Sequence, residues 1–363
     1  MTTDEKYMSR CIQLARNGFY GAAPNPMVGA VIVHDGKIIG EGYHVRCGGP
    51  HAEVNAVRSV RNPELLKEST IYVSLEPCSH YGKTPPCADL IVEKGIPRVV
   101  VGCMDPFAKV AGRGIRKLQE AGIEVTVGVL EAECLALNRR FITFHTHHRP
   151  YITLKWAESA DGFMDSLRTD YEKEKPYAFS TPYTRMLVHR CRAEHQAILV
   201  GRQTALADNP SLNLRMWPGK SPLRLVMDRR GDLPGHLALF NDGAETRVYL
   251  DVLSVLPPYG KQAGVTCVRL DFSRDILLQI LDDLYRLSVQ SLLVEGGHRL
   301  LESFISAGLW DEIRVEQSPV FLKEGVPSPS WPHGRIRTTE VEGHLLVHIL
   351  CLLYTSPSPR DTR

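Results

Sequence analysis

Short β-rich runs alternate with helical patterns along most of the chain, and this alternation limits the fold more than any other feature. Strands that are separated by helices form sheets whose faces the helices cover. We therefore expect an α/β fold in both halves of the chain. The expected strands are MVGAVIV, TIYVSL, RVVVGC and IEVTVGVL in the first half and YITLKWA, AILVG, LRLVMD, TRVYL and SLLVEGG in the second. The expected helices of the first half are HAEVNAV, CADLIVEKG, GRGIRKLQEAG and EAECLALNRRFITFH.

The chain has 363 residues, which is too long for one typical core, and two domains are expected. Polar residues and a proline in HTHHRP precede the strand YITLKWA, and this places a boundary near residue 148. HTHH resembles a metal-binding tract, but no Cys or carboxylate supports it, so we interpret it as a linker. Two late runs, EIRVEQSPVFL and VEGHLLVHIL, are expected to pair as antiparallel strands. The expected ranges are 1–147, 148–350 and a disordered or non-native Ser/Pro/Arg tail, 351–363.

Charge and cysteine content narrow the class of protein. The formal net charge is +2, from 43 Lys+Arg and 41 Asp+Glu, and this balance does not indicate a nucleic-acid groove. The start MTTDEKYMSR is polar, and no run of about 18 apolar residues occurs, so we expect a soluble, cytoplasmic protein without a membrane partner. Nine irregularly scattered cysteines indicate reduced thiols, some of them metal ligands.

His51, Cys78 and Cys87 form a candidate zinc site. Zinc prefers imidazole and thiolate ligands, and a catalytic zinc keeps one position for water. In zinc deaminases a glutamate that is not a ligand moves the protons, and Glu53 has the required place two residues after His51. A lone H-x-E is often an ordinary polar helix start. The order H-x-E followed by P-C and a second Cys matches the deaminase signature and favours the metal site.

Two further features identify the subtype of deaminase. Eight residues, SHYGKTPP, separate the two cysteines where the usual signature has two, and PNPMVG and AGRG flank the motif. With these motifs the chain resembles the bifunctional riboflavin-biosynthesis deaminase/reductase family over nearly its whole length, to about residue 350. The resemblance implies a cytidine-deaminase-like three-layer α/β/α domain, followed by a dihydrofolate-reductase-like α/β domain that uses NADPH. It also implies a small substrate, a diaminopyrimidinone bearing ribosylamino 5′-phosphate.

Family positions that recognise the substrate in the deaminase half match five residues here: Asn25, His44, His80, Lys83 and Asp105. An Asn side chain offers a donor and an acceptor to a pyrimidine edge, and a Lys supplies a charge for phosphate. The two histidines could equally be loop residues and the lysine a solvated surface residue. Where the family commonly has Asn-Pro, this chain has Phe107-Ala108, so one polar contact is missing or is supplied elsewhere.

The second half carries a Gly pair in SLLVEGGHRL and a polar loop after AILVG in AILVGRQTALADNPSLNLR. A glycine turn between a strand and a helix lets backbone N–H groups approach a phosphate, although such a pair can also be a plain turn, and it is not a G-x-G-x-x-G Rossmann motif. The resemblance places two groups of residues here. Those at the cofactor are Glu158, Ala178, Thr204, Asp208, Gly296, Gly297 and His298. Those at the ribosyl phosphate end are Arg192, Leu212, Arg215 and Glu295.

Three readings follow from these features. The first is the bifunctional enzyme, with Zn²⁺ and NADPH as cofactors. The second is a deaminase with an inactive reductase domain, because Ala178 takes the place of a family Trp; either Phe179 or Tyr177 substitutes for it, or the cofactor binds more weakly. Arg192 is alternatively a plain exposed helix residue. The third, a nucleic-acid base deaminase or RNA-binding module, is disfavoured by the balanced charge. A homo-oligomer is compatible with the sequence, which specifies no interface.

Overall fold

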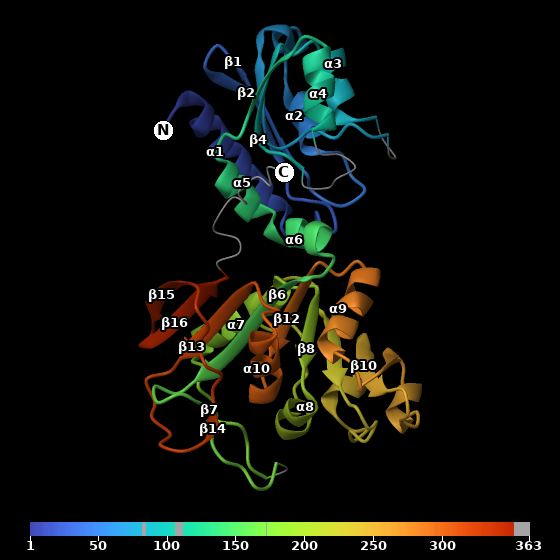
Figure 1. The fold of residues 1–363 in the computed structure, drawn as a ribbon. Coiled ribbons are helices and arrows are strands. Elements are labelled where there is room, and N and C mark those ends of the chain that lie inside the picture. The colour runs from blue at the N-terminus through green and yellow to red at the C-terminus, as the bar shows by residue number, and fades with distance from the viewer. Residues whose placement is uncertain (82–84, 106–111, 172, 352–363) are drawn as a thin grey trace, which may run out of the picture. The chain divides into compact units, whose positions relative to one another are not determined.

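The computed structural model describes residues 1–81, 85–105, 112–171 and 173–351, and the structural statements below concern those residues. The chain divides into two compact units, Met1–Arg149 and Pro150–Arg363, which we call the first and the second unit. In each unit, helices flank a central sheet (Figure 1). Each unit is described by itself.

The sheet of the first unit has five strands in the order β2-β1-β3-β4-β5. β1 is antiparallel to both of its neighbours, whereas β3, β4 and β5 run parallel. The parallel strands therefore end at one edge of the sheet, where the loops that follow them can gather polar side chains. The strands are β1 (Gly29–His34), β2 (Lys37–Tyr43), β3 (Thr70–Leu75), β4 (Arg98–Cys103) and β5 (Glu124–Val127).

Helices cover both faces of this sheet, because alternate residues of each strand point to opposite sides. The strand residues on the same face as Ile32 pack with α2, α3 and α4. Those on the opposite face, with Val31, pack with α1 and α5. The expected three-layer α/β/α arrangement is confirmed. The helices are α1 (Thr3–Ala15), α2 (Ala52–Ser59), α3 (Cys87–Glu93), α4 (Arg113–Glu120), α5 (Glu131–Leu137) and α6 (Arg139–His147).

The sheet of the second unit has nine strands in the order β11-β10-β9-β8-β12-β6-β13-β16-β15. Neighbouring strands from β11 to β13 are parallel, and β16 is antiparallel to β13 and β15. The expected antiparallel pairing of the two late runs is thus confirmed. The strands are β6 (Tyr151–Glu158), β8 (Ala197–Val200), β9 (Leu223–Met227), β10 (Thr246–Asp251), β11 (Val265–Leu270), β12 (Ser291–Glu295), β13 (Glu312–Gln317), β15 (Arg335–Val341) and β16 (His344–Leu350).

Two apolar clusters hold the second sheet between its helices. One cluster joins β6 and β12 to α9 and α10 through residues such as Trp156, Leu281 and Phe304. The other packs Cys191 of α7 and Ala205 of α8 on the opposite face. The helices are α7 (Pro182–Ala193), α8 (Arg202–Asp208), α9 (Ile276–Arg286) and α10 (His298–Ser306), and a separate small sheet pairs β7 (Phe163–Asp165) with β14 (Val326–Pro327).

The structure differs from the sequence-based expectations in three places. The segment after AILVG, expected to be a loop, first forms α8, and the loop begins at Asn209, whose φ of 40° ends the helix. The single helix expected over EAECLALNRRFITFH breaks at Asn138, whose side chain bonds the backbone of Met27 instead. α6 then continues to His147, so most of the HTHH tract is helical rather than linker.

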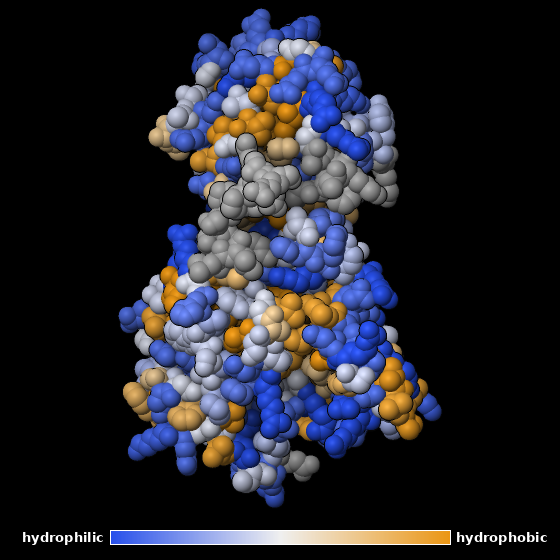
Figure 2. All heavy atoms as spheres, in the orientation of Figure 1, coloured by the Kyte–Doolittle hydropathy of each residue, from blue (hydrophilic) through white to orange (hydrophobic). Residues whose placement is uncertain are grey.

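The described helices include none that is long and apolar enough to cross a membrane. On the face of the molecule in Figure 2, hydrophobic residues form several separate groups among hydrophilic ones. Exposed large hydrophobic residues of the second unit include Leu253, Val255 and Phe321. All nine cysteines are free thiols, as the sequence indicated.

Candidate functional site

His51, Cys78 and Cys87 come together in the first unit, and their potential ligand atoms all lie within 4.8 Å of one another. His51 Nδ1 is 3.5 Å from Cys78 Sγ and 3.4 Å from Cys87 Sγ. A tetrahedral zinc ion with usual bond lengths holds a nitrogen and a sulfur ligand about 3.5 Å apart. The donor types and their spacing therefore fit zinc, with a fourth position left for water or substrate.

The local sequence explains why these three side chains meet. His51 is the extended residue before α2, and Cys87 is the first residue of α3, after Pro86. Cys78 follows the end of β3, and its carbonyl accepts the N–H of Ala88 at 3.1 Å. Two helix starts and one strand end thus supply the ligands, where helix dipoles and N–H groups favour negatively charged thiolates.

A glycine lets α2 approach the sheet closely. A Cβ on Gly42 of β2 would lie 2.4 Å from Ala56 N and 2.5 Å from Ala52 O, both in the backbone of α2. Any larger residue would push α2 outward. Because α2 begins just after His51 and carries Glu53, this contact helps to fix the site.

Glu53 lies in the first turn of α2 and is 3% exposed. Burial, followed by the negative charge of Cys78, raises the pKa of Glu53 to about 7. The hydrogen bond from Cys87 and the bond to His51 hold the pKa of the Cys78 thiol well below its usual range. A thiolate suited to bind a metal and a carboxylate suited to exchange protons therefore lie side by side.

Asn25 and His44 lie next to the metal group. Asn25 Nδ2 is 3.1 Å from His44 Nε2, and the ring of His44 meets the ring of His51 edge to face at 5.4 Å. His44 is 2% exposed, and burial lowers its pKa although the Pro50 carbonyl partly opposes the shift. The structure thus brings Asn25 and His44 to the site.

Asn138 holds the loop that carries Asn25. Its Oδ1 accepts the N–H of Met27 at 2.8 Å, and its Nδ2 donates to the carbonyl of Met27 at 2.9 Å. Asn138 is buried, so both bonds are shielded from water. Asn138 was not predicted as a site residue, because the sequence pattern indicated one continuous helix through this position.

The other three residues of the first unit that were expected to bind the substrate are His80, Lys83 and Asp105. His80 is exposed in the loop after Cys78. Asp105 follows β4, and its N–H donates to the buried carboxylate of Glu76 at 3.3 Å. Lys83, like Phe107-Ala108, lies outside the described residues. Glu76 is a second residue that the sequence analysis missed.

In the second unit, Arg192 and Glu295 form a largely buried ion pair. Arg192 Nη2 and Nε donate to one oxygen of Glu295 at 2.6 and 3.0 Å. Burial raises the pKa of Glu295, but the charges of Arg192 and Lys155 outweigh it and leave the pKa lowered. Lys155 of β6 lies opposite Glu295 of the parallel strand β12. Lys155 was not predicted as a site residue from the sequence. Arg192 is therefore not a plain exposed helix residue.

Arg215 and Leu212 lie close to this ion pair. The N–H of Arg215 donates to His189 Nδ1 at 3.3 Å, and burial together with the charges of Arg192 and Arg215 lowers the pKa of His189. Leu212 is buried with a φ of 52°. Arg192 also donates to the carbonyl of Asn213, the residue after Leu212, at 3.4 Å, so Arg192, Glu295 and the segment that carries Leu212 and Arg215 lie together.

Thr204 of α8 lies against the glycine pair. A Cβ on Gly296 would be 3.1 Å from Thr204 Cγ2, and one on Gly297 would be 2.9 Å from Thr204 Oγ1. Both glycines have positive φ, 85° and 79°. His298 then begins α10, and its Nδ1 is buried without a hydrogen-bond partner among the described residues. The structure thus brings Thr204, the glycine pair and the start of α10 together.

The other expected cofactor residues lie in different surroundings. Asp208 is bound by Arg168 at 2.6 Å, and burial raises the pKa of Asp208 against the effect of that arginine. Glu158 is buried and accepts the indole N–H of Trp156 at 2.7 Å. Ala178 is exposed.

The aromatic neighbours of Ala178 differ in exposure. Phe179 is buried, whereas Tyr177 is exposed, and their rings meet at 4.9 Å.

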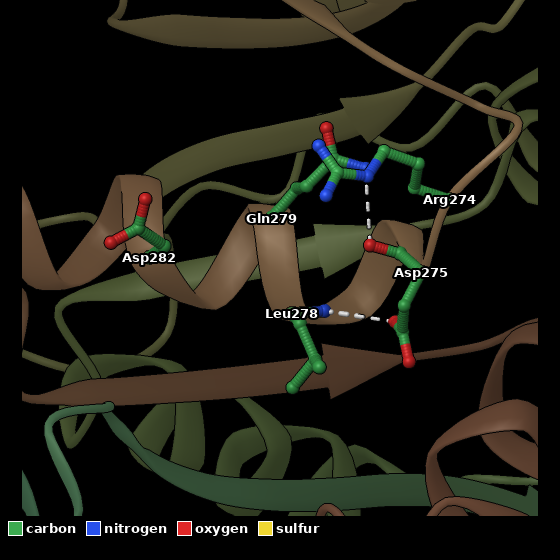
Figure 3. A pocket seen from close by; sticks show the side chains of 5 residues that line it. All are labelled: Arg274, Asp275, Leu278, Gln279 and Asp282. Carbon is green, nitrogen blue, oxygen red and sulfur yellow. Dashed lines mark hydrogen bonds between the residues drawn. The ribbon is translucent and has the colours of Figure 1, made fainter.

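A hollow on α9 is lined by none of these residues. Figure 3 shows its five lining side chains, among them Asp275, which caps the helix by accepting the N–H of Leu278 at 3.1 Å. The hollow contains none of the expected site residues and no cluster of metal ligands or nucleophiles. We therefore do not assign the chemistry to it.

Two family models match the chain, one in each of the two compact units. A family described as the cytidine and deoxycytidylate deaminase zinc-binding region matches residues 1–103, and the RibD C-terminal domain matches residues 150–338. The riboflavin biosynthesis protein RibD of Aquifex aeolicus is 41% identical over 325 residues, which are 89% of this chain and 89% of that protein. RibD of Escherichia coli is 37% identical over 342 residues, 88% of each protein.

Solved structures give the same result. The diaminohydroxyphosphoribosylaminopyrimidine deaminase/5-amino-6-(5-phosphoribosylamino)uracil reductase of Thermotoga maritima is 36% identical, with a TM-score of 0.84, and the match covers 96% of this chain and 99% of that chain. RibD of Acinetobacter baumannii is 32% identical, with a TM-score of 0.82 and coverages of 96% and 98%.

A zinc-binding deaminase unit followed by a dihydrofolate-reductase-like unit defines the class of bifunctional deaminase/reductases. The identity is near 40% over about nine-tenths of the chain. This level of identity shows membership of one family and not only a common fold. The chain belongs to the RibD family of riboflavin biosynthesis proteins.

Proposed function

We propose that the first unit removes the ring amino group of 2,5-diamino-6-ribosylamino-4(3H)-pyrimidinone 5′-phosphate. The second unit then uses NADPH to reduce the ribosyl chain, which gives 5-amino-6-(5-phosphoribitylamino)uracil. The observation that carries the proposal is the spacing of His51 Nδ1, 3.4 and 3.5 Å from the two cysteine sulfurs, with Glu53 buried beside them. The names of the related enzymes of known structure support the choice of substrate.

In the deaminase site, water replaces the amino group and ammonia leaves. Zinc held by His51, Cys78 and Cys87 would lower the pKa of a water molecule and so supply a hydroxide nucleophile. Glu53 moves two protons: it takes the first from the attacking water and delivers it to the ring nitrogen, and it then transfers the proton of the hydroxyl added to the ring carbon to the amino group, which leaves as ammonia. Its burial keeps bulk water from exchanging that proton.

The pyrimidine is held by residues beside the metal group. Asn25 and His44 adjoin His51 and can bind the polar edge of the ring, and Asp105 approaches from the end of β4. His80 and Lys83 belong to the segment between the cysteines, and we assign them the ribose phosphate, which needs positive charge.

In the reductase site, the dinucleotide supplies a hydride to C1 of the ribose. The bond between C1 and the ring oxygen breaks, the hydride forms the new C–H bond at C1, and the oxygen takes up a proton from water to become a hydroxyl group. Arg192, Arg215 and Glu295 bind the ribosyl phosphate end, together with Leu212, and Lys155 adds positive charge there. The residues that we assign to NADPH are Glu158, Ala178, Thr204, Asp208, Gly296, Gly297 and His298.

One assay tests both halves of the proposal. Zinc-loaded protein receives the diaminopyrimidine ribosylamino phosphate, and ammonia release and NADPH absorbance are recorded in the same cuvette. We expect ammonia first and NADPH consumption after it, with neither signal in a metal-stripped control. Absence of both signals in the zinc-loaded protein would refute the proposal.

A deaminase with an inactive second unit is the alternative. Two observations favour it: Ala178 is exposed where the family has a Trp, and Arg168 already occupies the carboxylate of Asp208. Titration of the metal-free protein with NADPH, followed by nicotinamide fluorescence, separates the two cases. Saturable binding supports the bifunctional enzyme, and its absence supports the alternative.

A further inference from the structure

Glu76 is a buried carboxylate that the mechanism above does not use. It follows β3 directly, stands two residues before Cys78 and is 4% exposed. A buried carboxyl group needs hydrogen-bond partners to replace the water that it loses on burial. Here the donors are backbone N–H groups of one distant segment.

Four backbone N–H groups donate to the two oxygens of Glu76. Oε2 accepts from Asp105 at 3.3 Å and from Gly112 at 2.9 Å. Oε1 accepts from Gly114 at 2.9 Å and from Ile115 at 3.4 Å. The last three donors lie at the N-terminus of α4, where N–H groups have no partner within the helix and the dipole favours an anion.

These bonds hold α4 against the two segments that carry the cysteines. A Cβ on Gly114 would lie 2.0 Å from the carbonyl oxygen of Pro77, the residue before Cys78, so only glycine allows this contact. Lys117 of α4 forms an ion pair with Asp89 of α3, the helix that Cys87 begins. Glu76 therefore fixes Asp105 and the start of α4 next to the metal group.

We propose that Glu76 is a positioning residue of the deaminase site, which holds Asp105 and the first turn of α4 in place for the pyrimidine substrate. This inference rests on the proposed function of the first unit. Among the described residues, no hydrogen bond joins the Glu76 side chain to His51, Cys78, Cys87 or Glu53. Its loss should therefore weaken substrate binding more than it slows the chemical step.

Two variants disturb the contact between Glu76 and the start of α4, one at Glu76 and one at Gly114. Glu76→Gln keeps the shape of the side chain, but one amide oxygen replaces two carboxylate oxygens, and its NH₂ group opposes two backbone donors. Gly114→Ala keeps the carboxylate and displaces α4 from Pro77. Glu64→Gln is the matched control, because the side chain of Glu64 is 77% exposed in the same unit.

The full-length, zinc-loaded protein is used for all measurements. For each variant we measure kcat and KM for ammonia release, zinc per chain, and NADPH consumption with the deaminated intermediate supplied directly. Hydrogen exchange at the amides of Gly112, Gly114 and Ile115 reports on the contact itself. We expect KM to rise about tenfold in both variants, which matches the loss of roughly one charged hydrogen bond, with kcat within about twofold of the wild type.

Zinc content and NADPH consumption should stay unchanged, and the three amides should exchange faster. An unchanged KM would overturn the proposal, as would a joint fall of zinc content and kcat, which would assign Glu76 to the metal site or to folding. If Glu76→Gln alone fails to fold, the KM of Gly114→Ala decides. Lack of ammonia release by the wild type would refute the proposed function instead, and hydrogen exchange would still test the contact of Glu76.

Discussion

Replacing Glu53 by Gln should stabilise the metal-free first unit at alkaline pH, although it should stop ammonia release. In the unfolded chain this carboxyl has its ordinary pKa of 4.5, whereas burial, followed by the charge of Cys78, raises the folded value to about 7. Because the folded pKa is the higher one, ionisation of Glu53 opposes folding. The cost is absent below the unfolded pKa, grows as the pH rises, and is complete above about pH 7.

The size of the effect follows from the shift. A pKa raised from 4.5 to about 7 corresponds to about 3 kcal/mol of unfolding free energy. The Glu53→Gln variant, which carries no charge at this position, should therefore exceed the wild type by about 3 kcal/mol near pH 8 and by less than about 1 kcal/mol near pH 5. A stability gain on loss of a catalytic group is the usual trade-off at active sites.

The measurement is urea denaturation of chelator-treated protein at both pH values. Far-UV circular dichroism reports both units, whereas tryptophan fluorescence reports the second unit alone, because all four tryptophans lie in that unit, from Trp156 to Trp331. A circular dichroism transition that the fluorescence does not share therefore belongs to the first unit. Glu64→Gln serves as the exposed control and should change little at either pH. A Glu53→Gln variant that is no more stable than the wild type near pH 8, or equally stabilised at both pH values, would refute the argument from burial.

Four further predictions concern other residues and the activity of the same variant. Glu53→Gln should bind zinc normally but lose ammonia release by at least about a hundredfold, as judged by metal analysis and an ammonia assay. Cys78→Ser should lose zinc and ammonia release together, while NADPH consumption with the deaminated intermediate persists. Arg192→Met should lower the unfolding free energy of the second unit by about 3 kcal/mol, measured by tryptophan fluorescence, because Glu295 would be left buried without its partner. Gly297→Ala should weaken NADPH binding and cost about 1 to 2 kcal/mol of stability, because its φ is 79° and the added Cβ would lie 2.9 Å from Thr204 Oγ1.

The central strands of both sheets were predictable because they are buried on both faces and read as continuous apolar runs. β4 and β8 are examples, and the sequence analysis named both. The strands that it did not name have weaker patterns. β15 is almost wholly exposed, and β2 is mostly partly buried and contains two glycines, so neither follows the apolar pattern of a buried strand.

The metal group was predictable because each ligand is marked by its own local motif. His51 precedes a helix, and Pro77 and Pro86 stand directly before the two cysteines. The reductase cluster has no such motif. Lys155 meets Glu295 only through the register of β6 against β12, two strands far apart in the sequence, and single-sequence patterns contain no information about that register.

The residues that hold the site loops are hidden from sequence reasoning for a different reason. Glu76 and Asn138 both bond to backbone groups of distant segments rather than to side chains. A backbone N–H carries no residue identity, so nothing in the partner segment signals the contact except a glycine such as Gly114, where the close approach excludes a Cβ. A buried polar residue without a chemical role in a metal site should therefore be examined first as the anchor of a loop, and the KM of its isosteric variant decides whether that loop serves the substrate.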